Sequence, residues 1–578
     1  MKGILKFAFV ACLAVVAGSA SVKAQTVVLD GLGSSGLFLE LGLGANATTT
    51  GGINASCVWS ENTNTAIATD TSLSTTTPGI DKGSAFVAWT KGSDGTCATA
   101  GNIYAYVSTD SVVGNRCLYN SNLAGGSKCS ISYATAPTAP VGLILTGGVA
   151  NCGTTGECAL PASVVTALDS STQLVNFAGT DIRPEDAKFA TTRALTNCGS
   201  VVGTSTQYLG LGYAAGSTIV TGVTGSTSFF NVLDFTLPTF FVTPVGATPI
   251  VVAVNDASGT GLHSFSNITS QALASFLDGT NSFTNQAAAA PTATGSAVTV
   301  FIREPLSGTY NTMEFNVPNR VGTSGGSFAT SQDVGLNQPA NQRNCTVTSP
   351  WPVPASTTST VLHDPLKFTT TSTGQRIRAI GTGQELSSVV GNTSNSIGYG
   401  FWSAANFAGF SAVTASAKYY NVDGIDPLAA SGTIPTTSAQ LANVSLATTA
   451  DGKYPIWSML RLVNVGATQD ANVAALSKAA QSFATSTHPD FVAANNLLVV
   501  RSHFTPPVQT LTLSDGSGST AAFGTNAATA CSATETGGDV GGVVIGLKVN
   551  TLSQSPLTVS ESNTCTPSNM AGQTGHRR

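Results

Sequence analysis

Residues 298–317 read VTVFIREPLSGTYNTMEFNV, and this stretch decides how the chain is interpreted. The apolar, β-branched run at 298–302 predicts a buried strand. Arg303 stands at the end of that run, and Ser307-Gly308-Thr309 follow where a helix would begin. An arginine at this point can face the same anion as the hydroxyls and free N–H groups of a helix N-terminus. The stretch therefore predicts a strand, a turn that can hold an oxyanion, and a helix.

The composition argues against nucleic acids as partners. Charged residues make up 9% of the 578 residues, against roughly a quarter in an average soluble domain. The formal net charge of −5 contains no basic cluster, so the chain lacks the electrostatic footprint that nucleic acids require. A chain of this length can bury more than one core, and we expect roughly two to four domains.

Residues 1–24 have the composition of an export signal. Two lysines lead into an apolar run from Phe7 to Val16, and small residues then lead to a cleavage site at Ala24. Cys12 offers an alternative as a lipid-bearing cysteine, although the apolar run before it is short. No later window has the ~20 uninterrupted apolar residues of a membrane span. We expect a periplasmic or secreted protein whose mature chain starts near Gln25.

The cysteines indicate disulfides. The chain has 11 cysteines, and removing Cys12 with the signal leaves ten, an even number in an exported chain. Cys152 and Cys158 are the best local pair, and Cys531 with Cys565 could staple the C-terminal tail. No C-x-x-C occurs and the five histidines are scattered, so we expect neither a metal nor another cofactor.

Short β-branched runs alternate with small-residue loops and a few helix-like stretches, which favours an α/β fold over a β-sandwich. No repeat of fixed period occurs, which counts against a solenoid adhesin. The predicted strands are 25–30, 102–108, 249–255 and 297–302, and the predicted helices are 269–278 and 469–485. Ser/Thr/Gly-rich tracts are interpreted as long surface insertions outside the core, at 45–80, 118–160 and 203–228.

The segment GLGSSG at 31–36 follows a strand-like run and satisfies G-x-G-x-x-G. A dinucleotide site is poorly supported, because no clear helix-then-strand unit and no closing acidic residue follow. A plain glycine turn is one alternative. The other is an anion cradle, in which glycines let backbone N–H groups approach an oxyanion at a helix N-terminus.

Two further segments share this character with 31–36 and 298–317. YVSTDSVVGNR at 106–116 carries Ser111 after an apolar run, and VNFAGTDIRPEDA at 175–187 carries Asp181 at a predicted strand end. For any single Ser, Thr or Asp in such a position, capping of a helix is the simplest interpretation.

The four segments together resemble the PstS-like phosphate-binding proteins of ABC transporters, which have the periplasmic-binding-protein type 2 fold. That family has G-A-G-[AS]-[TS]-F, G-x-G-S-x-x-G, D-F-x-x-S-D and R-x-x-x-S-G-T loops in this order, and this chain has GLGSSG, STDSVVG, NFAGTD and REPLSGT. The segments at 243–256 and 454–460 are similar to the family's two crossings between lobes, and 395–407 is similar to its I-G-Y segment. The resemblance covers about half of the mature chain, and the insertions have no counterpart in it.

The resemblance implies a ligand site in which each loop supplies donors to one phosphate. It implies that Asp181 accepts a proton from the ligand and that Arg303 supplies the full positive charge. Such a proton acceptor favours phosphate over sulfate, which brings no proton to share. The implied donors are the Ser35 hydroxyl, the Gly36 N–H, Ser111, and the Ser307, Gly308 and Thr309 groups.

The chain also departs from the family pattern. Pro305 and Leu306 stand where the family often has a second aspartate, and Asp110 or Glu304 could substitute. Gly36 replaces an aromatic residue that shields the family's site from water. Arg303 has an alternative as a partner in an interlobe salt bridge, for example with Glu304 or Glu314, and Arg116 and Arg183 lie beside two of the loops.

We therefore expect a two-lobed α/β receptor with a two-strand hinge and Ser/Thr/Gly-rich loop insertions. Lobe I would comprise 25–247 with 455–578, and lobe II would comprise 248–454. The expected function is capture of phosphate or a similar oxyanion for ABC-type uptake or sensing, without catalysis. By resemblance the protein is a monomer that docks on an inner-membrane permease.

Two rival classes remain open. A cell-surface structural or adhesive protein fits the low charge and the long insertions, and it predicts no tight binding of a small anion. A secreted hydrolase would need Ser35, Ser111 or Ser307 as its nucleophile, but no G-x-S-x-G elbow surrounds these serines.

Overall fold

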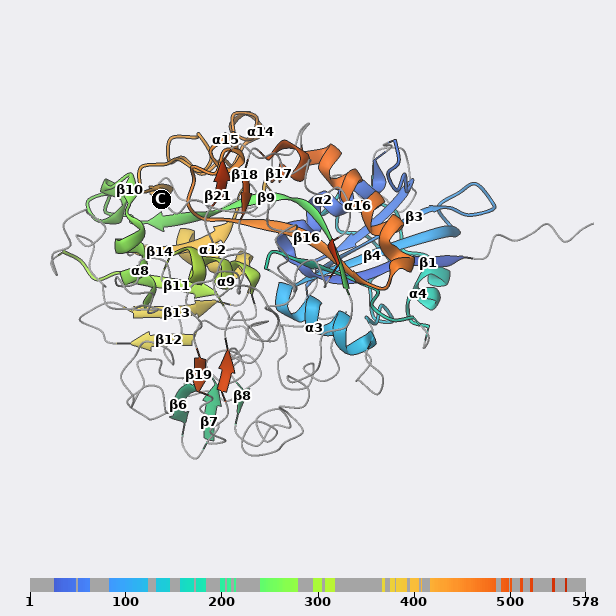
Figure 1. Ribbon diagram of the computed structural model, residues 1–578, viewed down its shortest axis with the longest axis horizontal. Helices are drawn as coiled ribbons and strands as arrows, with labels where there is room; N and C mark the ends of the chain where they lie inside the picture. The colour runs from blue at the N-terminus through green and yellow to red at the C-terminus, as the bar shows by residue number, and fades with distance from the viewer. Residues whose placement is uncertain are drawn as a thin grey trace, which may run out of the picture.

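The protein has a two-lobed α/β fold in its computed structural model (Figure 1). The described residues are 25–47, 50–62, 83–122, 131–145, 156–170, 173–182, 198–202, 205–208, 213–214, 240–278, 295–303, 307–317, 366–369, 375–379, 381–391, 395–404, 407, 416–484, 490–497, 499–501, 510–512, 520–522, 543–545 and 557–558. The predicted export signal and Cys12 lie outside these residues, and both stay predictions.

Lobe I contains one half of a long mixed sheet. Its strand order is β9-β16-β5-β1-β4-β3-β2. The bounds are β1 (Thr26–Ser34), β2 (Cys57–Glu61), β3 (Ser84–Lys91), β4 (Ala100–Thr109), β5 (Phe177–Thr180), β9 (Phe240–Asn255) and β16 (Trp457–Val465). Strand β1 runs parallel to both β4 and β5, so these three strands end at the same edge of the sheet.

Lobe II contains the other half of the sheet, in the order β12-β13-β11-β14-β9. The bounds are β11 (Thr299–Arg303), β12 (Leu366–Thr369), β13 (Gln375–Ala379), β14 (Ser396–Phe401), β10 (Asn267–Ile268) and β15 (Ala417–Val422). Strand β11 runs parallel to β13 and β14, and β15 pairs with both β9 and β10.

Strand β9 belongs to both half-sheets. Its first part, Phe240 to Pro249, pairs antiparallel with β16, and its second part, Ile250 to Asn255, pairs antiparallel with β14. Proline cannot donate to a β-ladder, and Pro249 lies where β9 changes partner. The predicted first crossing at 243–256 is confirmed as part of one continuous strand, and β16 is the second strand that runs between the lobes in Figure 1.

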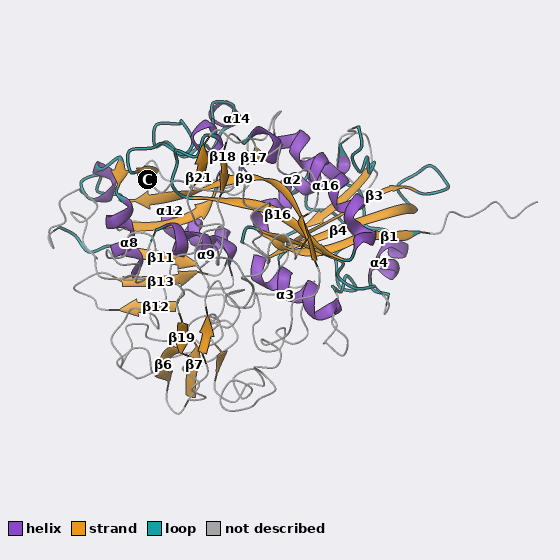
Figure 2. Ribbon diagram, in the orientation of Figure 1, coloured by secondary structure: helices purple, strands orange, loops and turns teal. Residues whose placement is uncertain are grey.

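Helices cover both faces of each half-sheet (Figure 2). In lobe I, α2 (Phe38–Asn46) and α16 (Asp470–Ala484) contribute to the core on one face, and α3 (Ser111–Asn122) and α4 (Ala162–Leu168) contribute to the core on the other. In lobe II, α8 (Ser270–Asp278) and α9 (Gly308–Asn316) pack on one face and α12 (Thr382–Gly391) packs on the other. The doubly covered sheet explains why nearly every residue of β9 is buried and apolar or small.

Shorter elements complete the described chain. The helical turns are η1 (Ser35–Leu37), η3 (Leu262–Ser264), α14 (Ser438–Leu441), α15 (Ala447–Ala450), η6 (Ala467–Gln469) and η7 (Ala494–Asn496). The remaining strands are β6 (Cys198–Val202), β7 (Ser205–Tyr208), β8 (Tyr213–Ala214), β17 (Val492–Ala493), β18 (Val499–Arg501), β19 (Thr510–Thr512), β20 (Thr520–Ala522), β21 (Val543–Ile545) and β22 (Leu557–Thr558).

The predicted strands and helices are confirmed; β1, β4 and β9 are longer than the sequence indicates, and β11 is one residue shorter. The clearest cases are β9, which spans 16 residues, and α8 and α16, which begin one residue after the predicted starts. The interpretation of 45–80 as a surface insertion is wrong for β2, because Val58 and Trp59 are fully buried. This edge strand is only five residues long within a tract rich in Ser, Thr and Asn, and its burial depends on its pairing with β3. The predicted lobe boundaries stay predictions.

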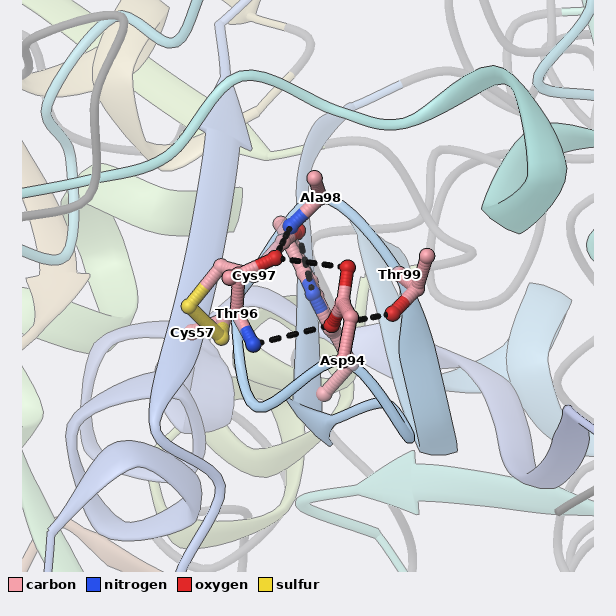
Figure 3. The surroundings of a disulfide bond; sticks show 7 residues. Cys57, Asp94, Thr96, Cys97, Ala98 and Thr99 are labelled. Atoms are coloured by element: carbon pink, nitrogen blue, oxygen red, sulfur yellow. Dashed lines mark hydrogen bonds between the residues drawn. A yellow bond between two sulfur atoms is a disulfide. The ribbon is translucent and has the colours of Figure 1, made fainter. Parts of the chain in front are cut away.

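A disulfide joins Cys57 of β2 to Cys97 in the turn between β3 and β4 (Figure 3). The carboxylate of Asp94 holds that turn, because it accepts hydrogen bonds from the Thr96 N–H at 2.9 Å and the Thr99 hydroxyl at 2.6 Å. Cys117 and Cys158 are also disulfide-bonded. Cys152, Cys531 and Cys565 lie outside the described residues, so the predicted pairings with them stay predictions.

The disulfides also decide how a cluster of potential metal ligands is interpreted. Within the described part of the chain, the sulfur atoms of Cys57, Cys97 and Cys158 all lie within 4.8 Å of one another. A metal needs the thiolate form of cysteine, whereas all three of these sulfurs are in disulfide bonds. The cluster therefore consists of disulfide-bonded cysteines. Its Cys57–Cys97 bond ties β2 to the turn between β3 and β4.

Two buried carboxyl groups lie within electrostatic reach of each other where the lobes join. Glu40 of α2 and Asp490, which precedes β17, are both buried. Asp490 accepts a hydrogen bond at 2.6 Å from the N–H of Ala404 in lobe II. The Thr248 hydroxyl donates to the carbonyls of Trp402 at 3.0 Å and Asp490 at 3.1 Å, so β9 is fixed to both lobes at this point.

This carboxyl pair predicts that stability falls as pH rises. Burial raises the pKa of Asp490 to about 7, and burial next to the charge of Asp490 raises the pKa of Glu40. The folded protein then binds more protons than the unfolded chain, so stability is lost as pH rises from the ordinary value of 3.8 through about 7. We expect the Tm, followed by circular dichroism, to fall across this range, and to fall less steeply in Asp490→Asn.

Asp94→Asn is the matched control for this pH series. Asp94 is exposed, and hydrogen bonds led by that of Thr99 lower its pKa, so its effect on stability lies at more acidic pH. The variant must keep the parental slope of Tm between about pH 5 and about pH 8. A slope in Asp490→Asn as steep as in the parent contradicts the assignment.

Candidate functional site

Three of the predicted site segments follow neighbouring parallel strands. Strand β1 ends at Ser34, β4 ends at Thr109 and β5 ends at Thr180. Their register brings these three ends to one edge of the lobe I sheet, since Ser34 pairs with Thr109 and Gly33 pairs with Gly179. Crevices beyond the carboxyl ends of parallel strands are the usual ligand sites of such sheets.

Ser111 and Asp181 meet at this edge. Ser111 is the first residue of α3, and its hydroxyl donates to the Asp181 carboxylate. The Asp181 N–H donates back to the Ser111 oxygen at 3.2 Å. Both side chains are buried, so the second and third predicted loops form one hydrogen-bonded unit.

The N-terminus of α9 reaches the same point from lobe II. A β-carbon placed on Gly308 would overlap an oxygen of Asp181 and would lie 2.5 Å from the Ser111 oxygen. The Thr312 hydroxyl of α9 donates to the Asp181 carbonyl at 3.4 Å. Only glycine fits at position 308, because the start of α9 packs directly on the carboxyl group of Asp181.

Arg303 is buried and bridges the lobes. Its guanidinium forms a salt bridge with Asp110 of lobe I at 3.0 Å, and it also donates to the hydroxyl of Thr382 at the start of α12. An interlobe salt bridge is the alternative that the sequence leaves open for Arg303, and the structure contains one. The carboxylate found is Asp110, whereas Glu304 lies outside the described residues.

Ser307 caps α9, as the simplest interpretation of such a serine expects. Its side chain accepts a hydrogen bond from the Tyr310 N–H at 3.3 Å, and its carbonyl accepts one from the Asn311 side chain at 2.7 Å. Ser307 and Thr309 are buried at the helix start next to Gly308. The cap fixes the first turn of α9, whose start packs on Asp181.

The glycines of segment 31–36 allow neighbouring segments to pack closely against this part of the chain. A β-carbon on Gly33, which has φ of 140°, would overlap the Gly179 carbonyl of β5. Ser34 caps η1 by accepting the Gly36 N–H at 3.2 Å, and its carbonyl accepts the Tyr106 hydroxyl at 2.7 Å. The geometry therefore does not support the dinucleotide alternative, which requires an open glycine loop before a helix.

Ser35 and Gly36 lie at the junction of the lobes. Ser35 is partly exposed, whereas Gly36 is buried. A β-carbon on Gly36 would lie 3.3 Å from Phe401 and 3.4 Å from Leu460. Phe401 of β14 thus supplies an aromatic ring next to the position at which this chain has glycine. The predicted contact of the Gly36 N–H with a ligand stays a prediction.

Opposing effects act on the ionisation of Asp181. Burial raises its pKa, while the hydrogen bond from Ser111 and the nearby charges of Arg303 and Arg461 act in the opposite direction. Burial is the largest effect, so the pKa of Asp181 lies above its ordinary value. A perturbed carboxyl beside two helix N-termini and two guanidinium groups has the character of a binding site.

The structure adds residues that the sequence did not identify. Thr382 contacts Arg303 from α12, and Arg461 of β16 lies within electrostatic reach of Asp181. Asp110, which the sequence suggests only as a substitute carboxylate, pairs with Arg303. Of the flanking arginines, Arg116 is buried within α3 and Arg183 lies outside the described residues.

Comparisons with known proteins give only distant likenesses. No protein-family model and no curated protein matches the chain. Among solved structures, the high-affinity periplasmic phosphate-binding protein PfluDING is 14% identical, with 57% of this chain and 78% of that chain covered and a TM-score of 0.28. The phosphate-binding protein of Stenotrophomonas maltophilia is 18% identical, with coverage of 54% and 71% and a TM-score of 0.26. PstS from Borrelia burgdorferi is 14% identical, with coverage of 44% and 72% and a TM-score of 0.25.

These values are too low to assign a function, so the site must be interpreted from its own geometry. The neighbours named are binding proteins for phosphate or, in the last case, PstS. In the described part of the chain, no helix has the length and apolar character needed to span a bilayer.

The packing of Gly308 predicts that any side chain there disrupts the site. Gly308→Ala must displace the Asp181 carboxyl or the start of α9, and we expect a loss of about 1–3 kcal/mol of unfolding free energy in a urea titration. Gly383→Ala, in the first turn of α12, is the control, because nothing lies within 4 Å of the added carbon. Equal stability of the two variants would show that α9 does not pack on Asp181 as described.

Proposed function

We propose that this chain is an extracytoplasmic solute-binding protein that captures phosphate, or a similar tetrahedral oxyanion, between its lobes. The observation that carries the proposal is the meeting of two helix N-termini from different lobes at one buried proton acceptor. Helix α3 begins at Ser111 in lobe I, and α9 begins at Gly308 in lobe II, and both starts contact Asp181. The predicted site residues are Ser35, Gly36, Ser111, Asp181, Arg303, Ser307, Gly308 and Thr309.

The donors at this point suit an oxyanion. Helix N-termini carry free N–H groups and partial positive charge, and α3 and α9 direct both toward the junction of the lobes. Hydrogen bonds to a charged group contribute roughly 1.5–3 kcal/mol each, so roughly three to six of them match the ~8 kcal/mol of micromolar affinity before binding costs. Because the donors come from both lobes, only an arrangement in which the lobes meet can engage all of them, which links capture to lobe closure.

Asp181 gives the site a way to distinguish oxyanions. A carboxylate opposite an oxyanion is repulsive unless one proton lies between them. Hydrogen phosphate brings that proton, whereas sulfate does not. Asp110 is the proposed substitute for the second carboxylate that the family motif places after the arginine, and its salt bridge with the Arg303 guanidinium supports this.

The proposal describes binding without catalysis. A hydrolase needs a base next to its serine nucleophile. In the described residues Ser111 donates to Asp181, the carboxyl group that the proposal assigns to the ligand's proton, and the described histidine, His263, contacts the Ser416 carbonyl of lobe II at 2.7 Å. We further propose delivery of the captured ion to a membrane permease, with the protein acting as a monomer outside the cytoplasm.

Calorimetry of the mature chain with phosphate, sulfate, molybdate and arsenate tests the proposal. We expect phosphate to bind with micromolar or tighter affinity, and Arg303→Ala to weaken it by about a hundredfold or more, because that variant leaves Asp110 facing the anion. Lys453→Gln, which removes an exposed charge with 68% of its side-chain surface accessible, is the control and must bind like the parent. No phosphate heat with the folded parent leaves the structural or adhesive class as the better interpretation.

Sulfate binding should depend on pH through Asp181. Because burial raises the pKa of Asp181, its protonated form persists to higher pH than that of an ordinary aspartic acid and can donate to sulfate. We expect sulfate affinity to rise as the pH falls, whereas in Asp181→Asn, which donates at every pH, it should change little. Calorimetric titrations from about pH 4.5 to about pH 8 measure this pH dependence. A sulfate affinity of the parent protein that does not change with pH contradicts the role of Asp181.

A further inference from the structure

Arg461 lies on the strand that connects the lobes, next to the proposed site. In the β16–β5 ladder it pairs with Thr180, the residue before Asp181. In the β16–β9 ladder it pairs with Pro244, at a register shift between Leu460 and Arg461. Pro244 has no N–H to donate, and bulges of this kind redirect a side chain.

The face of β16 that carries Arg461 is the face under α3 and α9. Successive residues of a strand point to opposite faces, so Arg461 shares its face with Val463. Val463 belongs to the core formed with Val112 and Val113 of α3. Both α3 and α9 contact β16, and Figure 1 shows the three elements together at the centre of the molecule. Arg461 thus lies beneath the two helices whose N-termini meet at Asp181.

The guanidinium of Arg461 is held in place. One of its nitrogens, Nη1, donates to the Met459 carbonyl at 2.8 Å, and the residue is only 7% exposed. Its charge reaches Asp181, because Arg461 and Arg303 both act to lower the pKa of that carboxyl. A fixed and buried cation next to Asp181 is pre-organised for an anion at the same place.

The charge of Arg303 is already matched by carboxylates. Asp110 forms the salt bridge with it, and the buried Glu314 and Glu385 lie near Tyr399, whose side-chain oxygen accepts the Arg303 N–H at 3.4 Å. A doubly charged anion placed beside Arg303 and Asp110 alone would meet no net positive charge. Burying an uncompensated charge is costly, so a dianion requires a second cation close by.

We propose that Arg461 is a specificity-determining residue of this site, where its guanidinium provides the positive charge that a tetrahedral dianion needs beyond Arg303. The site then prefers hydrogen phosphate over dihydrogen phosphate. This inference rests on the proposed function, and it adds the charge state of the ligand and the residue that selects it.

The test compares phosphate affinity in the parent, Arg461→Gln and Arg461→Lys, by calorimetry from about pH 6 to about pH 8, where phosphate loses its second proton. Asp181 also faces the site, so the series is repeated with Asp181→Asn in every variant to remove its titration. The other ionisable groups around the site are the same in all variants. They are Asp110, Glu314, Glu385, Tyr106 and Tyr399.

We expect the parent to bind phosphate more tightly as pH rises. Arg461→Gln should weaken binding roughly tenfold to a hundredfold at the upper pH and flatten the pH dependence, and Arg461→Lys should restore the slope because it keeps the charge. A role only in folding would lower the Tm without changing this slope. Lys453→Gln, which removes an exposed charge elsewhere, must keep the parental affinity and slope.

Parental affinity and slope in Arg461→Gln overturn the inference. If that variant does not fold, Arg461→Lys decides, since a flattened slope with the charge retained also overturns it. Failure of this inference is distinct from failure of the proposed function. Absence of phosphate binding in the parent refutes the function, whereas binding that depends on Arg303 but not on Arg461 refutes only the role of Arg461.

Discussion

Strand β9 is the constraint on which the rest of the structure depends. It pairs with β16 along one part and with β14 along the next, so the two half-sheets share a backbone and cannot separate without breaking its ladders. The pairing changes at Pro249, where the missing N–H removes one donor, and the Thr248 hydroxyl next to it ties β9 to Trp402 and Asp490. Pro249 and Thr248 thus mark the point on β9 at which the two lobes join.

The candidate site lies at this junction, where strand ends of lobe I meet the end of β11 and the start of α9 from lobe II. The parallel strands of lobe I deliver Ser35, Ser111 and Asp181 to one edge, while β11 of lobe II delivers Arg303 and α9. The contact between Gly308 and Asp181 requires the absence of a side chain on one partner and a carboxyl group on the other. The meeting of helix starts from both lobes at the buried Asp181 is the physical basis of the proposed binding.

Carboxyl groups are few in this protein, and the buried ones differ in the hydrogen bonds and charges that surround them. Glu157, fully buried, accepts hydrogen bonds from the Ser60 N–H at 2.9 Å and the Ile144 N–H at 2.8 Å, so one carboxylate orders a loop beside β2. Glu40 and Asp490 instead act on each other electrostatically, and in the described residues Glu40 has no such donors, which favours the protonated forms. Asp181 lies between these cases, because burial and its hydrogen bond from Ser111 act in opposite directions.

The sequence by itself determined the local elements and the order of the hydroxyl-bearing turns. Apolar β-branched runs mark β1, β4, β9 and β11, and a serine followed by helical spacing marks the start of α8, because these signals act within a few residues. The same local logic placed Asp181 and Arg303 at strand ends, and Ser111 and Gly308 where helices begin.

Only the tertiary structure decided which of these groups meet. The Asp110 partner of Arg303 lies 193 residues away, and Arg461 reaches Asp181 through strand pairing that no local pattern encodes. The burial of β2 and the Glu40–Asp490 pair were likewise hidden, since both arise from contacts between distant segments. Hydrogen bonding within a turn is fixed by neighbours in the chain, whereas charge pairing and burial depend on how the sheet is assembled.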